Sequence, residues 1–281
     1  MKFFLKKIIK FISRPKENYP NIYILGYHLL KALQKSLIKL RLIKQTQTNA
    51  RDMFNWSLYD LHYKGELKEA EKEFTINLKP NDYIYTNSKL IKNNKNIKPL
   101  HPSHRLLYET ILQLNPSSVF EMGCGSGMHL YNLQTLNSQI KLSGIDLSEK
   151  QINSLHKRYP KLEADIKQAD ATANDNLNNL PQVDLAFTQA VIMHIHTDHL
   201  HMNALENLFK MSKKYVLLYE SPKNHKFMDD INYLFNQKRI LWNNLFFYYR
   251  INEENNKPSP MICSNEKLNY LVLEDYNILF N

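Results

Sequence analysis

A run of glycines after a short apolar segment has the residue types and spacing of a ligand-binding turn. In SSVFEMGCGSG the apolar segment ends at Glu121, and Gly123, Gly125 and Gly127 follow. Glycine permits positive φ angles and lets backbone N–H groups approach a ligand closely. At a helix N-terminus these groups also carry partial positive charge. The pattern predicts a ligand-binding turn between a strand and a helix, and a tight turn without a ligand is the alternative.

Two acids follow where further strands are expected to end. Asp146 follows Gly123 by 23 residues, in KLSGIDLSE, and Asp170 closes the next strand-like segment, in QADAT. Parallel strands end at the same edge of a sheet, where the ligands of doubly wound sheets bind. We therefore expect both carboxylates beside the glycine turn, with Asp146 placed to bind ribose hydroxyls. The alternative is that both acids are buried for structural reasons.

The glycine spacing separates two cofactor classes. The dinucleotide pattern G-x-G-x-x-G/A needs Gly or Ala at position 128, where this chain has Met128, whereas acid-x-G-x-G-x-G is intact from Glu121 to Gly127. The segments EMGCGSG, GIDLSE, QADAT and VDLAFTQAVIMHI resemble successive motifs of class I S-adenosylmethionine (SAM)-dependent methyltransferases. The resemblance extends from about residue 104 to 221. It implies SAM as cofactor and a Rossmann-like, doubly wound α/β sheet, mostly parallel with an antiparallel terminal strand.

The resemblance also implies which residues bind the cofactor. They are Glu121, Gly123, Cys124, Gly125, Gly127, Asp146, Leu147, Asp170, Ala171 and Gln189. The glycines and Cys124 would lie beneath the methionine part of SAM, and Leu147 would line the adenine pocket. Asp170 and Ala171 would meet the adenine, while Gln189, followed by Ala190, would lie beside the site of methyl transfer.

A group of histidines follows the fourth expected strand, in VIMHIHTDHLH. The histidines are His194, His196, His199 and His201. A histidine with a pKa of about 6.5 suits removal of a hydroxyl proton, which makes His194 and His196 the candidate catalytic residues. The alternative is that they end the strand or precede a helix capped by Thr197 or Asp198. A metal site would need converging geometry, and none is predicted.

Strand-like and helix-like segments alternate after residue 104, as in a parallel sheet covered by helices. The expected strands are 119–122, 141–146, 165–170, 183–189 and 215–220, and the expected helices are 104–114, 128–136, 148–159 and 199–211. A last helix is expected over 229–239. Residues 245–250 and 270–274 are expected to form a terminal antiparallel pair.

The basic charge is confined to the N-terminal region. The chain has a formal net charge of +10, and residues 1–44 account for all of it. Two amphipathic basic helices are expected there, for contact with an anionic membrane surface, with RNA, with a protein partner or with the catalytic domain. We expect three regions: a basic helical extension (1–45), a cap or linker (46–103) and a SAM-binding domain (104–281). No signal peptide or transmembrane helix is expected.

The predicted function is methyl transfer from SAM to a hydroxyl of a small molecule or glycan. No N-P-P-[YF] sequence follows the fourth strand, which in related enzymes marks methylation of amino groups, so hydroxyl, carboxyl and other nitrogen acceptors stay open. The alternatives are an RNA methyltransferase that uses residues 1–44 as a basic arm, and a non-catalytic membrane-associated scaffold. Only two cysteines occur, Cys124 and Cys263, which favours a cytoplasmic setting, with peripheral membrane contact through the basic region.

Overall fold

The computed structural model describes residues 76–173, 180–195, 199–221, 225–252, 257–269 and 274–275. By its internal contacts the chain divides into two units, Met1–Glu69 and Ala70–Asn281. All described residues belong to the second unit. The expected basic helices of residues 1–45, and residues 46–75 of the expected cap, lie outside the described residues.

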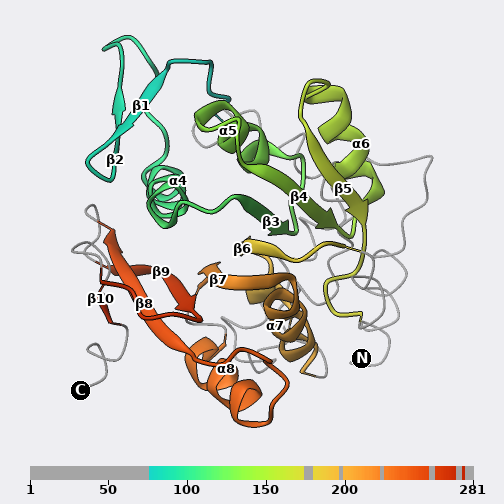
Figure 1. The fold of residues 1–281 in the computed structure, drawn as a ribbon. Coiled ribbons are helices and arrows are strands. Elements are labelled where there is room, and N and C mark those ends of the chain that lie inside the picture. The colour runs from blue at the N-terminus through green and yellow to red at the C-terminus, as the bar shows by residue number, and fades with distance from the viewer. Residues whose placement is uncertain are drawn as a thin grey trace, which may run out of the picture. The chain divides into compact units, whose positions relative to one another are not determined.

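An eight-stranded sheet forms the centre of the described structure (Figure 1). In spatial order its strands are β10 (Glu274–Asp275), β8 (Phe246–Asn252), β9 (Lys257–Ser264), β7 (Ser212–Tyr219), β6 (Val183–Gln189), β3 (Ser118–Met122), β4 (Lys141–Asp146) and β5 (Ala164–Gln168). The strands from β7 to β5 are parallel to their neighbours. β9 runs antiparallel to both β7 and β8, and β10 runs antiparallel to β8. Chain order reverses between β3 and β6, which is where ligands of such sheets bind.

Helices cover both faces of this sheet (Figure 1). They are α4 (Pro102–Leu114), α5 (Met128–Leu136), α6 (Glu149–Arg158), the short 3-10 turn η2 (Ile192–His194), α7 (Leu200–Met211) and α8 (Phe227–Asn236). Two buried apolar clusters result, one with residues of α4, α5 and α6 and the other with residues of α7 and α8. Val119 belongs to the first cluster and its neighbour Phe120 to the second, because successive strand residues point to opposite faces. The Rossmann-like α/β fold expected from the sequence is therefore confirmed.

Local sequence explains the bounds of α4, the helix that leads into β3. Pro102 occupies its first turn, where the missing N–H leaves no hydrogen bond unmade. Asn115 ends the helix with a left-handed φ of 48°, directly before Pro116. The predicted end at Leu114 is confirmed, and the helix begins two residues before the predicted start at His104.

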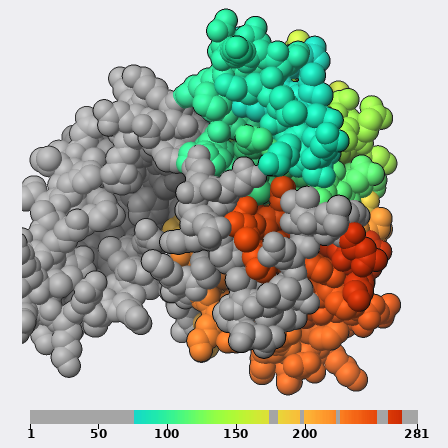
Figure 2. All heavy atoms as spheres, turned by 90° about the vertical axis from the view of Figure 1, so that its left-hand side faces the viewer, coloured from blue at the N-terminus to red at the C-terminus, as the bar shows by residue number. Residues whose placement is uncertain are grey.

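A β-hairpin precedes α4 in the region expected to be a cap or linker. β1 (Tyr83–Thr86) pairs antiparallel with β2 (Lys89–Lys92) through a two-residue turn. The turn residues, Asn87 and Ser88, both have positive φ angles of 48° and 60°, as this class of hairpin turn requires. Leu90 is buried in the α4–α6 cluster, and α4 contacts both β2 and β8. In Figure 2 the blue-green hairpin and α4 lie beside the orange and red C-terminal strands.

The C-terminal strands differ from the expectation in one respect. Glu274, the last residue of the predicted segment 270–274, does pair antiparallel with β8, together with Asp275. The strand inserted between β7 and β8 is β9, however, which the sequence analysis did not predict. Among the described residues, none of the helices is long and apolar enough to cross a membrane.

Candidate functional site

The glycine turn joins β3 to α5 at the switch point of the sheet. Gly123, Gly125 and Gly127 all have positive φ angles, of 76°, 51° and 79°. The N–H groups of Gly123 and Cys124 both donate to the carbonyl of Ile145, at 2.8 and 2.9 Å. These bonds fasten the turn to the end of β4. The predicted strand-to-helix turn is therefore present, and its backbone needs glycine at three positions.

The three glycines differ in what surrounds them. A Cβ on Gly123 would lie 2.4 Å from Val191 Cγ2, and one on Gly127 would lie 2.5 Å from Leu155 Cγ. Both distances are too short, so these glycines also allow close packing of the turn against its neighbours. A Cβ on Gly125 would meet no atom nearer than 4.0 Å. Gly125 therefore borders open space, where a ligand can approach the backbone.

Asp146 points toward the glycine turn. Its Oδ2 accepts a hydrogen bond from the Gly125 N–H at 2.8 Å, and its Oδ1 accepts one from the Ser148 N–H at 2.8 Å. The carboxylate thus connects the end of β4 to the glycine turn and to Ser148, the N-cap of α6. The sequence interpretation required the Asp146 carboxylate to lie beside the glycine turn, and it does.

Asp170 is placed differently. β5 ends at Gln168, two residues earlier than predicted, and Asp170 lies in the following turn. Its Oδ1 accepts hydrogen bonds from the N–H and the hydroxyl of Thr172, both at 2.8 Å. One oxygen of Asp170 therefore stabilises its own turn and does not contact the glycines.

Glu121, the acid before the glycines, is buried at the end of β3. Its exposed fraction is 2%, and its Oε2 has no hydrogen-bond partner among the described residues. Burial, with the negative charge of Asp146 as a smaller cause, raises the pKa of this carboxyl well above its ordinary value. A protonated Glu121 is favoured, and such a group can donate a hydrogen bond.

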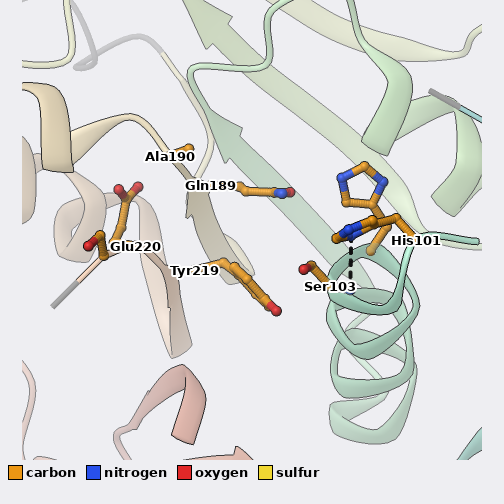
Figure 3. A pocket seen from close by; sticks show the side chains of 8 residues that line it. His101, Ser103, Gln189, Ala190, Tyr219 and Glu220 are labelled. Atoms are coloured by element: carbon orange, nitrogen blue, oxygen red, sulfur yellow. Dashed lines mark hydrogen bonds between the residues drawn. The ribbon is translucent and has the colours of Figure 1, made fainter. Parts of the chain in front are cut away.

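A cavity of about 370 Å³ lies beyond the ends of β6 and β7 (Figure 3). It is lined by His101, Ser103, His104, Gln189, Ala190, Tyr219, Glu220 and Ser221. In Figure 3 the Gln189 side chain points from the end of β6 toward His101, and Tyr219 points from the end of β7 toward Ser103. The cavity therefore combines the start of α4 with the two strands on the far side of the switch point from Asp146.

Glu220 binds the turn of residues 191–193, which lies between this cavity and the glycines. Its Oε1 accepts hydrogen bonds from the Thr188 hydroxyl and from the N–H groups of Val191 and Ile192, at 2.9 to 3.3 Å, and its Oε2 accepts one from Met193 N–H at 3.0 Å. Burial raises the pKa of this carboxyl, although the four donors act in the opposite direction. Glu220 thus fixes Val191, the residue that packs against Gly123.

Comparison with known proteins finds a family model that matches the central part of the chain. Residues 119–214 match the family model described as "Methyltransferase domain". This stretch begins at β3 and includes the glycine turn, Asp146 and β6. Residues 119–214 are therefore similar to a methyltransferase domain. No curated protein matches the chain in sequence.

Several solved methyltransferase structures are similar to this chain. The methyltransferase domain of bacterial CtHen1 has 16% identity and a TM-score of 0.43, covering 58% of this chain and 97% of that chain. The magnesium protoporphyrin IX methyltransferase ChlM from Synechocystis, with bound SAM, has 13% identity and a TM-score of 0.40, covering 57% and 75%. The amino pentose methyltransferase CalS10 from Micromonospora echinaspora, also SAM-bound, has 16% identity and a TM-score of 0.38, covering 46% and 54%.

The glycine turn has features that fit SAM, the cofactor that the sequence resemblance implies. Gly125 faces open space, and the buried Oε2 of Glu121 has no partner among the described residues. Leu147, next to Asp146, has an exposed fraction of 51% and offers apolar surface at the sheet edge. The individual roles predicted for these residues, and for Cys124, Asp170 and Ala171, stay predictions.

The predicted catalytic histidines are only partly described. His194 is the last residue of η2, three residues beyond Val191, and is not among the residues that line the cavity. His196 lies outside the described residues. His199 and His201 belong to the start of α7, where His201 stacks on His225 with ring centroids 4.1 Å apart. The described residues contain no group of three or more metal-binding side chains.

Most residues of the cavity were not singled out from the sequence, His104 and Glu220 among them. His104 was expected only as the start of a helix, and Glu220 only as the end of a strand. His104 has an exposed fraction of 7%, and its Nδ1 is buried with no hydrogen-bond partner among the described residues. The sequence HPSH before α4 contains two histidines, but nothing in it indicates a cavity formed with β6 and β7.

Proposed function

We propose that this methyltransferase transfers the methyl group of SAM to a hydroxyl of an uncharged small molecule or glycan. The observation that supports the proposal most directly is the lining of the cavity beyond β6 and β7. Its described lining residues include histidines, serines, Gln189 and Tyr219 but no lysine or arginine. Such a surface suits hydroxyl groups, whereas phosphate and carboxylate groups are usually bound by cations.

The position of the cavity supports its use by the acceptor. Gln189 and Ala190 line it, and Val191, the next residue, packs where a side chain on Gly123 would lie. The cavity therefore borders the glycine turn on the side opposite Asp146. A cofactor bound along the glycine turn and Asp146 would leave this space for the group that receives the methyl.

The reaction requires little of the protein beyond aligning the acceptor with the methyl group of SAM. SAM supplies a methyl group that is already activated. The protein must hold the acceptor oxygen in line and accept its proton where needed. We retain His194 as the proposed base, with His196 as the second candidate. His194→Ala is expected to lower kcat by roughly 100-fold and to leave SAM affinity unchanged.

Methyl transfer from radiolabelled SAM tests the proposal. Full-length protein is incubated with extract separated into neutral small molecules and glycans, anionic small molecules, lipids and RNA. The expected result is label in a neutral fraction that stays bound to the product after treatment with alkali, as a methyl ether does. Label in RNA or in anionic compounds would contradict the proposed acceptor class. Label in no fraction, from protein that binds SAM by calorimetry, would contradict the proposed function as a whole.

The basic region of residues 1–44 is a separate proposal, because it lies outside the described residues. We propose that its excess positive charge brings the enzyme to anionic membranes. Liposomes containing phosphatidylglycerol should carry the full chain upward in flotation and should not carry a chain that lacks residues 1–44. Salt-sensitive RNA binding lost on the same deletion would favour the RNA methyltransferase instead.

A further inference from the structure

The β1–β2 hairpin, at the periphery of the described structure in Figure 1, presents two isoleucines to solvent. Ile84 and Ile91 are direct cross-strand partners, and their exposed fractions are 52% and 53%. Cross-strand partners project from the same face of a hairpin, so these side chains form one apolar surface. Thr86 and Lys89 share this outer face, because side chains alternate along each strand. The inner face carries Leu90, which is only 1% exposed.

Hydrogen bonds hold the inner face of the hairpin on the domain. The Leu90 N–H donates to Glu109 Oε1 at 2.8 Å, and the Leu100 N–H donates to the Tyr83 hydroxyl at 2.9 Å. Glu109 is itself buried on α4 and accepts from Arg105 Nε at 2.8 Å. The hairpin therefore presents its outer face in a fixed position. A surface that is already in place loses little conformational entropy when it binds a partner.

Positive charge surrounds this apolar surface. Residues 76–100 contain five lysines but a single acid, Asp82. All five lysines are exposed, and they are Lys79, Lys89, Lys92, Lys95 and Lys98. Residues 45–281 as a whole are formally neutral, so the hairpin segment is a local concentration of positive charge in a neutral part of the chain.

The combination of apolar and basic side chains favours one kind of partner. On an anionic membrane, isoleucines can enter the interface while lysines meet the lipid headgroups. An RNA backbone would attract the lysines but would leave the isoleucines in water. Residues 1–44 and a second copy of the chain both carry a net charge of +10, which opposes their docking on a basic face.

From these features we infer that the outer face of the hairpin is a binding surface for anionic membrane lipid, separate from the basic region of residues 1–44. Its contact adds to that of residues 1–44, because stable attachment to a bilayer usually takes two signals. The inference goes beyond the proposed function and does not depend on which compound receives the methyl group.

A fluorophore on the outer face reports this contact directly. Thr86→Cys places a thiol at an exposed position, and the native Cys124 and Cys263 are buried, so a nitrobenzoxadiazole label reaches position 86 selectively. When vesicles of phosphatidylglycerol and phosphatidylcholine are added to the labelled full-length protein, the emission should shift to the blue and increase. The same label on Asn153→Cys, at an exposed position of α6, is the control and should not respond.

Removal of the two isoleucines measures the apolar part of the contact. Ile84→Ser combined with Ile91→Ser should lower the partition coefficient of the full-length protein on these vesicles by about 10-fold, because two apolar side chains no longer leave water. Both positions are exposed, so Tm should stay unchanged. Leu241→Ser, at a position with an exposed fraction of 83%, is the matched control and should partition like wild type.

Removal of two lysines measures the electrostatic part. Lys95→Gln combined with Lys98→Gln should lower the partition coefficient by about 10-fold at low salt and by less at high salt. Lys150→Gln combined with Lys157→Gln, at exposed positions of α6, removes the same charge elsewhere and should have a smaller effect.

The outcomes separate this surface from the other proposals. Flotation of the full chain without a response of the label at position 86 would overturn the inference and leave contact through residues 1–44 standing. A label that is blue-shifted before vesicles are added would also overturn it, because another part of the chain would then cover the face. So would a response to RNA but not to vesicles, or equal losses in the isoleucine variant and Leu241→Ser. A full chain that neither floats nor responds would overturn both membrane proposals and leave the proposed methyl transfer untouched.

Discussion

The two sides of the switch point are built by different means. On the cofactor side, backbone groups and glycines dominate: three positive φ angles, two N–H bonds to Ile145 and an Asp146 carboxylate that binds the turn itself. On the cavity side, side chains dominate: His101, His104, Gln189 and Tyr219 come from three separate parts of the chain. The first side is a local structure of β3, β4 and the turn between β3 and α5. The second exists only once the whole sheet has formed.

This difference has a consequence for how each side tolerates change. A backbone-built turn depends on conformations that only glycine adopts without strain, so a single added methyl group can distort it. A cavity lined by side chains can be altered one residue at a time without disturbing the strands beneath it. The cofactor side is therefore expected to be conformationally demanding, and the cavity side is expected to determine which acceptor binds.

The largest expected effect is on the cofactor side, at Gly123. In Gly123→Ala the new Cβ would lie 2.4 Å from Val191 at a φ of 76°, so strain and overpacking add. We expect a loss of roughly 4 kcal/mol in the free energy of unfolding, measured by urea denaturation. Gly125→Ala, with a similar φ but open space around it, is the control and should lose about 1 kcal/mol. Equal losses in the two variants would show that packing against Val191 does not matter.

The same contrast explains what the sequence allowed us to predict. The strands 141–146 and 183–189 and the helix 128–136 were predicted with the bounds that the structure has. The regular alternation of strand-like and helix-like segments marks these elements, and the glycines mark where β3 gives way to α5. The cofactor side could be assembled from the sequence because its parts follow one another along the chain.

Three strands were missed for identifiable reasons. In the hairpin 83–92 apolar residues lie on both faces, with Ile84 and Ile91 exposed, so no alternation pointed to a buried side. β9 contains Pro258 and Pro260, and proline ordinarily argues against a central strand. The structure accommodates them because β7 pairs with β9 only from Met261 onward.

The cavity could not be predicted for a different reason. Its residues belong to the start of α4 and to the ends of β6 and β7, which are far apart in the chain. His104 and Glu220 are ordinary residues of a helix and a strand end until the sheet brings them together. Only Gln189 and Ala190 were predicted at this site, because a family motif contained them.

Glu220 connects the two sides, and its removal tests how separate they are. Glu220→Ala would leave the Thr188 hydroxyl and three backbone N–H groups without their acceptor. We expect a loss of roughly 3 kcal/mol in unfolding free energy, together with weaker SAM binding, because Val191 would no longer be fixed beside Gly123. Thr188→Val, which removes a single donor, should cost about 1 kcal/mol and leave SAM affinity unchanged.

A smaller effect is expected for Asp146, and on cofactor affinity rather than on folding. Asp146→Ala removes the acceptor of the Gly125 N–H and, in our interpretation, the partner of the ribose hydroxyls. Calorimetry with S-adenosylhomocysteine should show affinity reduced by about 10- to 100-fold. Asp165→Ala, at an exposed position on β5, is the matched control and should bind normally. Normal binding by Asp146→Ala would place the cofactor elsewhere and undo the division into two sides.

The smallest effect concerns the buried carboxyl of Glu121, and it depends on pH. Its pKa in the folded protein is raised above the ordinary value of 4.5, because burial disfavours the charged form. The wild type therefore loses stability as pH rises from about 4.5 toward the folded-state pKa, since only the unfolded chain ionises freely there. Glutamine does not titrate, so Glu121→Gln avoids this loss.

Glu121→Gln should consequently be more stable than wild type by roughly 1–2 kcal/mol at pH 7 and equally stable at pH 4. Urea denaturation at pH 4, 5, 6 and 7 measures the difference, and Glu163→Gln at an exposed position should show none of it. A gain that does not vary with pH would mean that Glu121 is not kept protonated by burial. A gain accompanied by weaker SAM binding would show that this carboxyl is held in an unfavourable setting because the cofactor needs it.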